Sequence, residues 1–256
     1  MNSGLLEPMR FWRVLKSRKM ATQATSIAAN LERITEKIAG AAKRAGRRSD
    51  EITIVAVSKT FPAERIRAAY DAGLRHFGEN RIQEFEAKHS LVGLSDAIWH
   101  FIGHLQSNKA HRAVHLFDRI DSVDSISLAR KLEVASEMEG KSLPVLIEVR
   151  LSEEETKSGV REGELAPLAE SIRKSLHLEL HGLMTIPPYA SDPQNVRPYF
   201  RRLRELRDGL CRQLGLRLPV LSMGMSHDFE IAVEEGATEV RMGTALFGER
   251  TPRTNF

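Results

Sequence analysis

The sequence predicts an α/β fold, a single (β/α)8 barrel of the TIM type with one extra helix at its N-terminal side. Three observations lead to this prediction. Eight short strand candidates follow one another along the 256 residues, and helical stretches separate most of them. The first candidate, Ile52–Val57, is apolar on both faces, as is typical of parallel strands covered on both sides. Eight such strand–helix units in about 200 residues favour a closed barrel over an open sheet, and nothing in the composition marks a linker or a second domain.

The chain begins with a basic segment that we place outside the barrel. Residues 1–20 hold five basic residues against Glu7, a net charge of 5 − 1 = +4, which equals the formal charge of the whole chain. The high isoelectric point therefore does not indicate a nucleic-acid-binding face on the domain. We expect residues 1–20 to be a disordered or mis-annotated extension and residues 21–256 to form the barrel. A transit peptide is the alternative for this segment.

The elements are predicted from periodicity in chain order. The first helix, Ser26–Gly46, repeats apolar residues every three or four positions, and Ser26 is a possible N-cap. After Ile52–Val57, seven further strands are predicted at His76–Asn80, Trp99–Gly103, Arg119–Val123, Val145–Arg150, Leu180–Thr185, Val220–Ser226 and Glu239–Thr244. The later helices are predicted at Pro62–Ala72, Asp124–Glu139, Glu162–Ser175, Pro193–Leu214 and Asp228–Glu235.

A lysine stands directly after the first predicted strand. Lys59 follows a run of apolar and small residues, so its stem is expected to emerge from the barrel interior. A lysine in a partly desolvated pocket loses its proton readily and can attack a carbonyl to form a Schiff base. The alternative is a lysine that extends its charge into solvent at a strand end.

The ends of the last two strands are rich in glycine and hydroxyl side chains. Gly224 and Ser226 end the seventh strand, and Gly243 and Thr244 end the eighth. These loops form the usual phosphate site of barrel enzymes. A helix predicted from Asp228 would add a favourable field for an anion. The alternative is that these residues serve only tight turns and helix caps.

Together these features define a ligand with an aldehyde or ketone at one end and a phosphate at the other. Pyridoxal 5′-phosphate fits this description, and so do the sugar phosphates of an aldolase. Arg241 lies two residues before Gly243 and therefore on the same face of its strand, near the ring of such a ligand.

The motifs around these residues identify a family. The sequence resembles the pyridoxal phosphate homeostasis proteins, whose fold is similar to the barrel domain of alanine racemases, over roughly residues 24–250. The matching segments are Val57-Ser58-Lys59-Thr60, His76-Phe-Gly-Glu-Asn80, Trp99-His-Phe-Ile-Gly103, Leu105-Gln-Ser-Asn-Lys109, Lys157-Ser-Gly159, His181-Gly-Leu-Met184, Leu221-Ser-Met-Gly-Met-Ser226 and Val240-Arg-Met-Gly-Thr244.

The resemblance implies roles for individual residues. Lys59 matches the lysine that holds pyridoxal phosphate as a Schiff base, and Arg241 matches the arginine that faces the pyridine nitrogen. The remaining matches are the phosphate-binding Ser226, Gly243 and Thr244, and the pocket-lining Asn80, His104 and Met223. The chain departs from the family at position 150, where asparagine is frequent and Arg150 stands here. An arginine that pointed into the pocket would add positive charge beside the cofactor.

The resemblance implies a carrier or regulator in intracellular vitamin B6 and amino-acid homeostasis, not a catalyst, and no catalytic residue is assigned. Arg241 cannot accept the proton of the ring nitrogen, so a strong electron sink is not expected. The alternative is a weak pyridoxal-phosphate-dependent amino-acid racemase, which needs a base on each face of the cofactor. Tyr189, after the sixth strand, could approach the pocket mouth. Apo forms of pyridoxal-phosphate enzymes are possible transient partners of a monomer.

Other classes of function find little support in the sequence. Cys211 is the single cysteine, so no intramolecular disulfide can form, and a reducing compartment such as the cytoplasm is expected. No spacing of histidine, cysteine and carboxylate residues predicts a metal site. No apolar run reaches the length of a membrane span.

Overall fold

The computed structural model describes residues 7–152, 154 and 158–249, with side chains from Ser26 onward. Its centre is a closed barrel in which eight strands pair in parallel with their neighbours in chain order. The strands are β1 (Thr53–Val57), β2 (His76–Glu79), β3 (Ile98–Phe101), β4 (Arg119–Val123), β5 (Leu143–Glu148), β6 (Leu178–Met184), β7 (Val220–Met225) and β8 (Glu239–Met242). The predicted (β/α)8 class is confirmed.

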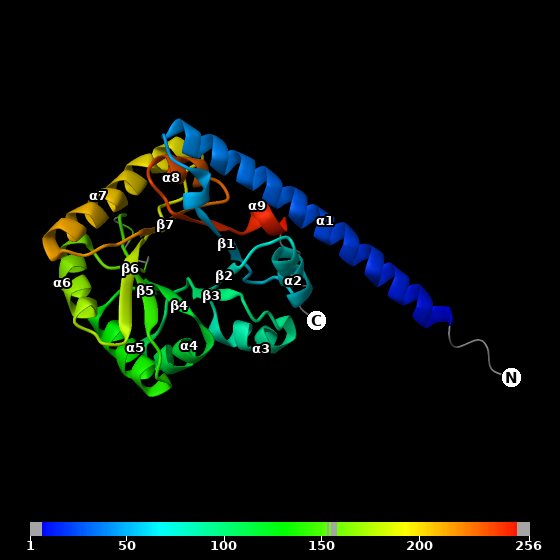
Figure 1. Ribbon diagram of the computed structural model, residues 1–256, viewed down its shortest axis with the longest axis horizontal. Helices are drawn as coiled ribbons and strands as arrows, with labels where there is room; N and C mark the ends of the chain where they lie inside the picture. The colour runs from blue at the N-terminus through cyan, green and yellow to red at the C-terminus, as the bar shows by residue number, and fades with distance from the viewer. Residues whose placement is uncertain (1–6, 153, 155–157, 250–256) are drawn as a thin grey trace.

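The helices cover the outside of the barrel (Figure 1). The α-helices after the first strand are α2 (Ala63–Asp71), α3 (Ile82–Val92), α4 (Ala110–Leu116), α5 (Ile126–Glu139), α6 (Glu162–Arg173), α7 (Arg197–Leu214), α8 (Phe229–Glu234) and α9 (Thr244–Phe247). Short 3-10 turns occupy Ser49–Glu51, Ser107–Lys109 and Pro193–Val196. No range was predicted for α3, α4 or α9. The N-cap residue of α3 is Arg81, a residue type that is not a preferred N-cap.

The first helix, α1, is longer than predicted. It spans Glu7–Arg44, so it begins well before Ser26 and continues through Met20 without a break. Residues 7–20 form the first part of this helix, whereas the expected extension at residues 1–20 and the domain boundary at residue 20 stay predictions. The N-terminal half of α1 projects away from the barrel (Figure 1).

The C-terminal half of α1 completes the ring of helices. It packs against α2, α8 and α9, next to the seam where β8 meets β1. Asn30 donates a hydrogen bond to the carbonyl of Leu246 at 2.9 Å, and Arg44 forms an ion pair with Glu234 at 2.7 Å. Because α9 has only four residues, α1 covers the seam that a longer eighth helix would cover.

The hydrophobic core lies between the strands and the helices. Outward-facing strand residues such as Ala56, Phe77 and Val240 are fully buried in it together with the apolar faces of the helices. The alternate strand residues face the barrel interior, as the two-residue period of a strand requires. Within the described helices, none is both long and apolar enough to cross a membrane.

The lower interior of the barrel, near the amino ends of the strands, holds charged side chains. Branched apolar side chains are usual at such positions. Arg119 on β4 donates to Asp121 at 2.6 Å and, across the barrel, to Glu239 on β8 at 2.7 Å. His100 joins Asp121 at 2.9 Å and His76 at 2.9 Å. The ligand atoms of His100, Asp121 and Glu239 lie close enough to hold a metal. However, the Arg119 guanidinium already supplies the positive charge between the two carboxylates, so we interpret the cluster as structural.

Candidate functional site

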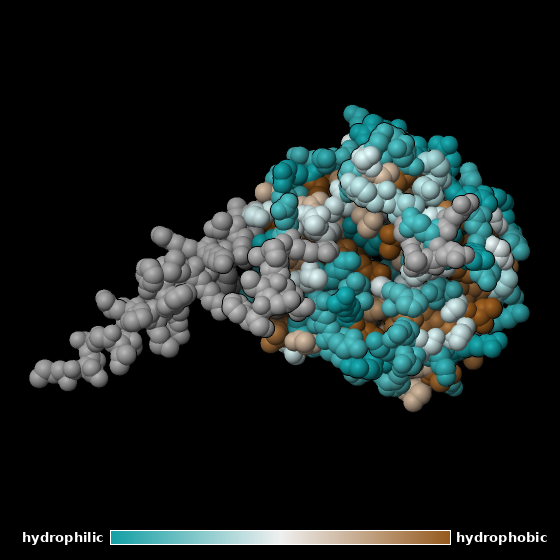
Figure 2. Space-filling view, turned by 180° about the vertical axis from the view of Figure 1, so that it is seen from behind, coloured by the Kyte–Doolittle hydropathy of each residue, from teal (hydrophilic) through white to brown (hydrophobic). Residues whose placement is uncertain are grey.

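The predicted ligand-binding residues follow adjacent strands at one end of the barrel. The strand β1 lies between β8 and β2, and Val57 pairs with Gly78 while Ala56 pairs with Met242. Continuing these registers by two residues places Lys59 beside Asn80, and Ser58 beside Thr244. We call this end of the barrel, where the carboxyl ends of the strands meet, the mouth. The strands whose ends carry the predicted residues therefore follow one another around the mouth in the order β2, β1, β8 and β7. The face opposite to that of Figure 1 is hollowed near its centre, with hydrophobic side chains exposed in the depression (Figure 2).

Lys59 stands in a turn with an unusual backbone. Its side chain is partly buried, and the next residue, Thr60, has a φ of 69°. Among the residues with described backbone, Thr60 is the only non-glycine with positive φ. A β-branched residue in this region is strained, and such strain gathers at functional sites when the surroundings enforce it. The chain therefore leaves β1 in one defined direction at Lys59.

The loops after β7 and β8 are joined to each other. The Ser226 hydroxyl accepts a hydrogen bond from the backbone N–H of Ala245 at 3.1 Å, which brings Ser226 next to Gly243 and Thr244. A side-chain carbon at Gly243 would lie 3.8 Å from Cβ of Val57, so this loop also borders the end of β1, the strand that precedes Lys59.

The turn after β7 is shaped by Asp228 and Gly224. One Asp228 carboxylate oxygen accepts the backbone N–H of Met225 at 2.6 Å and so closes the turn. Burial raises the pKa of Asp228 above its ordinary value, although that backbone contact opposes the effect. Gly224 has a φ of 90°, and a Cβ there would lie 2.5 Å from Cβ of Ala232. Only glycine fits between this loop and α8.

Arg241 lies below this loop, buried in the barrel interior. Its guanidinium donates to the Ser222 hydroxyl at 2.9 Å and to the carbonyl of Thr185 at 2.9 Å. Burial lowers the pKa of Arg241, and nearby carboxylates, led by Asp121, oppose this shift. The guanidinium is thus a fixed cation under the mouth, and it has no lone pair with which to accept a proton.

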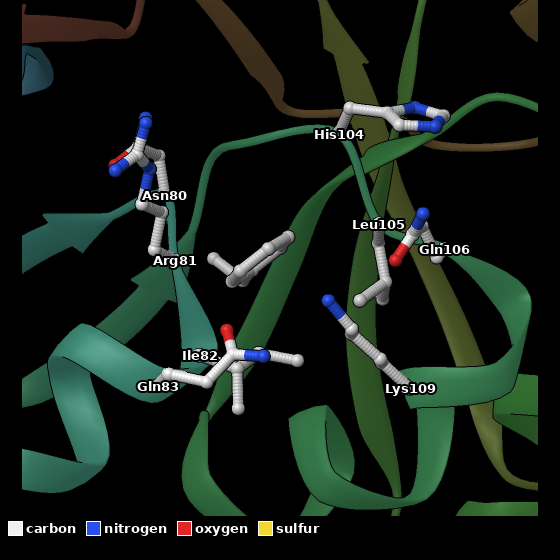
Figure 3. Close-up of a pocket in the computed structure, with 9 residues that line it drawn as sticks. Asn80, Arg81, Ile82, Gln83, His104, Leu105, Gln106 and Lys109 are labelled. Carbon is white, nitrogen blue, oxygen red and sulfur yellow. The ribbon is translucent and has the colours of Figure 1, made fainter.

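Asn80 is held at the mouth by close packing. A Cβ at Gly103 would lie 2.6 Å from the Asn80 carbonyl oxygen, so the chain after β3 can approach Asn80 only with glycine at this position. Asn80 also lines a neighbouring pocket of about 320 Å³ between the start of α3 and the segment before α4 (Figure 3). Lys109 directs its amine into this pocket, and His104 lies at its rim, where it pairs with Asp124 at 3.2 Å.

Not every predicted residue joins this group. The Met223 side chain is fully buried in the outer hydrophobic core, on the side of β7 opposite to Ser222 and Gly224. The structure therefore does not bring it to the mouth. Arg150 follows β5, is partly buried, and its backbone N–H donates to Val160 at 2.9 Å.

One polar group at the mouth was not predicted from the sequence. Glu148, the last residue of β5, is buried, and its carboxylate accepts a hydrogen bond from Ser158 at 3.0 Å. Burial raises the pKa of Glu148 above its ordinary value, although Ser158 opposes the shift. The sequence did carry a signal for this residue, because Glu148 stands near the carboxyl end of a predicted strand, where site residues of a barrel gather.

The residues present fit a phosphorylated aldehyde. One lysine amine can bond the aldehyde, and the joined Ser226 and Gly243–Thr244 loops offer a hydroxyl and backbone donors to a phosphate. Between them, the buried Arg241 can face a ring nitrogen as a donor. The void that Gly243 leaves open beside Val57 gives the ligand room to approach the backbone.

Comparisons with known proteins agree with this arrangement. The family described as "Alanine racemase, N-terminal domain" matches residues 29–251. A protein of Aquifex aeolicus named "Pyridoxal phosphate homeostasis protein" is 48% identical over 220 residues, which are 86% of this chain and 96% of that protein. The Escherichia coli K12 protein of the same name is 41% identical over 232 residues, which are 88% of this chain and 97% of that protein.

A solved structure supports the same relation. PipY of Synechococcus elongatus, determined with pyridoxal phosphate bound, superposes with a TM-score of 0.77 at 39% identity, covering 87% of this chain and all of PipY. With relatives this similar along nearly their whole length, the chain belongs to the pyridoxal phosphate homeostasis protein family and has the fold of the alanine racemase N-terminal domain.

Proposed function

We propose that this protein binds pyridoxal 5′-phosphate as a Schiff base on Lys59. It acts in intracellular vitamin B6 and amino-acid homeostasis as a carrier or regulator and not as a catalyst. The observation that carries the proposal is the convergence of Lys59, Asn80, Ser226 and Gly243–Thr244 on four neighbouring strand ends, with Arg241 beneath them. The bound cofactor of PipY supports the choice of ligand.

Each residue has a role in holding the ligand. The Lys59 nitrogen forms a carbon–nitrogen double bond with the aldehyde carbon, and the aldehyde oxygen leaves as water with the two amine protons. The Ser226 hydroxyl and the backbone at Gly243 and Thr244 bind the phosphate. Arg241 orients the ring from below and keeps its nitrogen unprotonated, which weakens the cofactor as an electron sink. Asn80 lines the ring on the side of β2.

A carrier role needs no second base beside the cofactor. The alternative, a weak amino-acid racemase, requires a second base on the face away from Lys59. Tyr70 binds Asp96 outside the mouth, and Tyr199 packs against the outer core. Tyr189 is 83% exposed and stacks on His227, with ring centroids 5.5 Å apart. Tyr189 thus directs its ring toward His227 and solvent. We further propose that the protein is a cytoplasmic monomer that meets apo enzymes transiently.

The proposal is tested by the absorbance spectrum of the purified protein after addition of pyridoxal phosphate. We expect a visible Schiff-base band that borohydride removes, with the label found on Lys59 by peptide mapping. The Lys59→Ala variant should lack the band, whereas the matched control Lys109→Ala, a lysine in the neighbouring pocket, should keep it. A band that persists in Lys59→Ala would contradict the assignment.

The role is tested separately from binding. The loaded protein is incubated with D- or L-alanine, and the enantiomers are separated by chiral chromatography. We expect no turnover above that of free pyridoxal phosphate. Turnover that Tyr189→Phe abolishes would establish the racemase alternative.

A further inference from the structure

The lysine-bearing turn is attached to α3 by a buried ionic group. Lys88 on α3 is 8% exposed, and its amine donates to the carbonyl of Ser58 at 3.0 Å. The same amine contacts carboxylate oxygens of Glu79 at 2.6 Å and Glu84 at 3.3 Å. None of these three charged residues has a part in the ligand-binding roles described above.

The second attachment lies on the other side of Lys59. The backbone N–H of Thr60 donates to the Glu84 carboxylate at 2.5 Å. The Ser58 carbonyl belongs to the peptide unit before Lys59, and the Thr60 N–H belongs to the unit after it. Because each peptide unit is planar, holding both units fixes φ and ψ of Lys59 and hence the direction of its Cα–Cβ bond.

We propose that Glu79, Glu84 and Lys88 form a Lys59 clamp, a set of positioning residues that fix the backbone of Lys59 so that its amine points into the mouth. The inference deepens the proposed function and rests on it for the role of the amine. The strained Thr60 supports the clamp, since a residue keeps a positive φ of 69° only where its surroundings hold it.

The charges of the Lys59 clamp are arranged to hold it together. Glu79 is fully buried, and one of its oxygens accepts both the Lys88 amine and the Ser58 hydroxyl, each at 2.6 Å. The other Glu79 oxygen has no hydrogen-bond partner among the residues that the structure describes. Lys88 is therefore the cation on which the buried carboxylate depends, and its loss would leave that charge uncompensated. Variants of Lys88 or Glu79 can fail to fold for this reason.

Glu84 is the better position for a test because it is partly exposed and Lys88 keeps Glu79 as a partner. Glu84→Ala removes the acceptor of the Thr60 N–H. Glu84→Gln keeps an acceptor oxygen at the same distance and serves as the conservative rescue. Glu86→Ala is the matched control, since Glu86 lies on the same helix but pairs with Arg112.

Two measurements are made on each variant. Amide hydrogen exchange of Thr60 is followed by NMR in cofactor-free protein, and affinity for pyridoxal phosphate is followed by the borohydride-sensitive band. For Glu84→Ala we expect Thr60 exchange to accelerate about tenfold and the affinity to fall about tenfold, the effect of a lost hydrogen bond to a charged group. Thermal unfolding should change little, and Glu84→Gln and Glu86→Ala should resemble the parent protein.

The outcomes separate the two proposals. Unchanged Thr60 exchange in Glu84→Ala would overturn the Lys59 clamp, whatever the cofactor does. Faster exchange with unchanged affinity would overturn its positioning role, because the backbone would then be free without consequence for the amine. If the parent protein formed no Schiff base on Lys59, the proposed function and the positioning role would both fail, while Thr60 exchange would still decide whether the turn is held.

Discussion

The turn after β7 offers a sharp test of how the mouth is built. The perturbation is Gly224→Ala, a single added methyl group. Gly224 has a φ of 90°, and a Cβ there would lie 2.5 Å from Cβ of Ala232 and 3.0 Å from Cα of Phe229. Both neighbours belong to α8, which packs against β7. The loop or the helix must therefore shift to admit the methyl group.

The magnitude follows from two separate costs. A positive φ costs a residue with a Cβ about 1–2 kcal/mol. Overpacking a well-filled site by one methyl group adds about 1–3 kcal/mol. Together they predict a loss of about 2–5 kcal/mol in the free energy of unfolding, a large part of the stability of a typical domain. Because the shifted loop carries Ser226, affinity for pyridoxal phosphate should fall as well.

Urea unfolding followed by circular dichroism measures the first effect. The matched control is Gly209→Ala in α7, where an added Cβ would meet no atom of the described part of the chain within 4 Å. That change should stabilise the protein by about 0.5–1 kcal/mol, because glycine weakens a helix interior. If Gly224→Ala were as stable as Gly209→Ala and bound the ligand equally well, the tight fit between β7 and α8 would be refuted.

Three further predictions concern charges in and below the mouth. Arg119→Met removes the guanidinium that its two buried carboxylate partners share and should cost about 3–5 kcal/mol by urea unfolding at pH 7. Burial lowers the pKa of His76 from 6.5 to about 4. Between these two pH values the unfolded chain therefore binds a proton at His76 that the folded protein does not bind. The stability should fall by about 1–2 kcal/mol between pH 6.5 and pH 4, after allowing for partial exposure, and His76→Asn should flatten this slope. Asp228→Ala removes the acceptor of the Met225 N–H and should cost about 1–2 kcal/mol, whereas Asp228→Asn should be close to the parent protein.

Periodicity in the sequence was enough to predict the barrel but not all of its helices. Arg119–Val123 has the predicted limits, and the other seven strands differ from prediction by one or two residues at one or both ends. The helix α3 received no range because it buries Lys88 on the face that joins it to the barrel, which obscures the apolar stripe. The early start of α1 was missed because residues 7–20 were set aside for their charge.

The grouping of residues at the strand ends could be predicted from residue types at known positions, whereas the chemistry of these residues stays a prediction. Lys59, Ser226, Gly243 and Thr244 were found in this way, and the structure brings them together. The inward alternation of Ser222, Gly224 and Ser226 was also readable, and it excludes the intervening Met223 from the interior. Contacts between segments that lie far apart in the sequence could not be predicted. Glu84 and Lys88 have helical i,i+4 spacing, but nothing local shows that they hold the turn at Lys59.

The charged lower interior and the mouth are best understood as one electrostatic unit. Arg241 is fully buried, and burial alone makes its charge unfavourable. Asp121 opposes this most strongly, followed by Glu148, and Asp121 in turn is kept ionised by Arg119 and His100, which hold its pKa well below the ordinary value despite its burial. Each charge thus depends on the layer beneath it. A barrel filled with branched apolar residues could stabilise the fold equally well, but it could not hold an arginine under the mouth, where we propose that Arg241 donates to the ring of the cofactor.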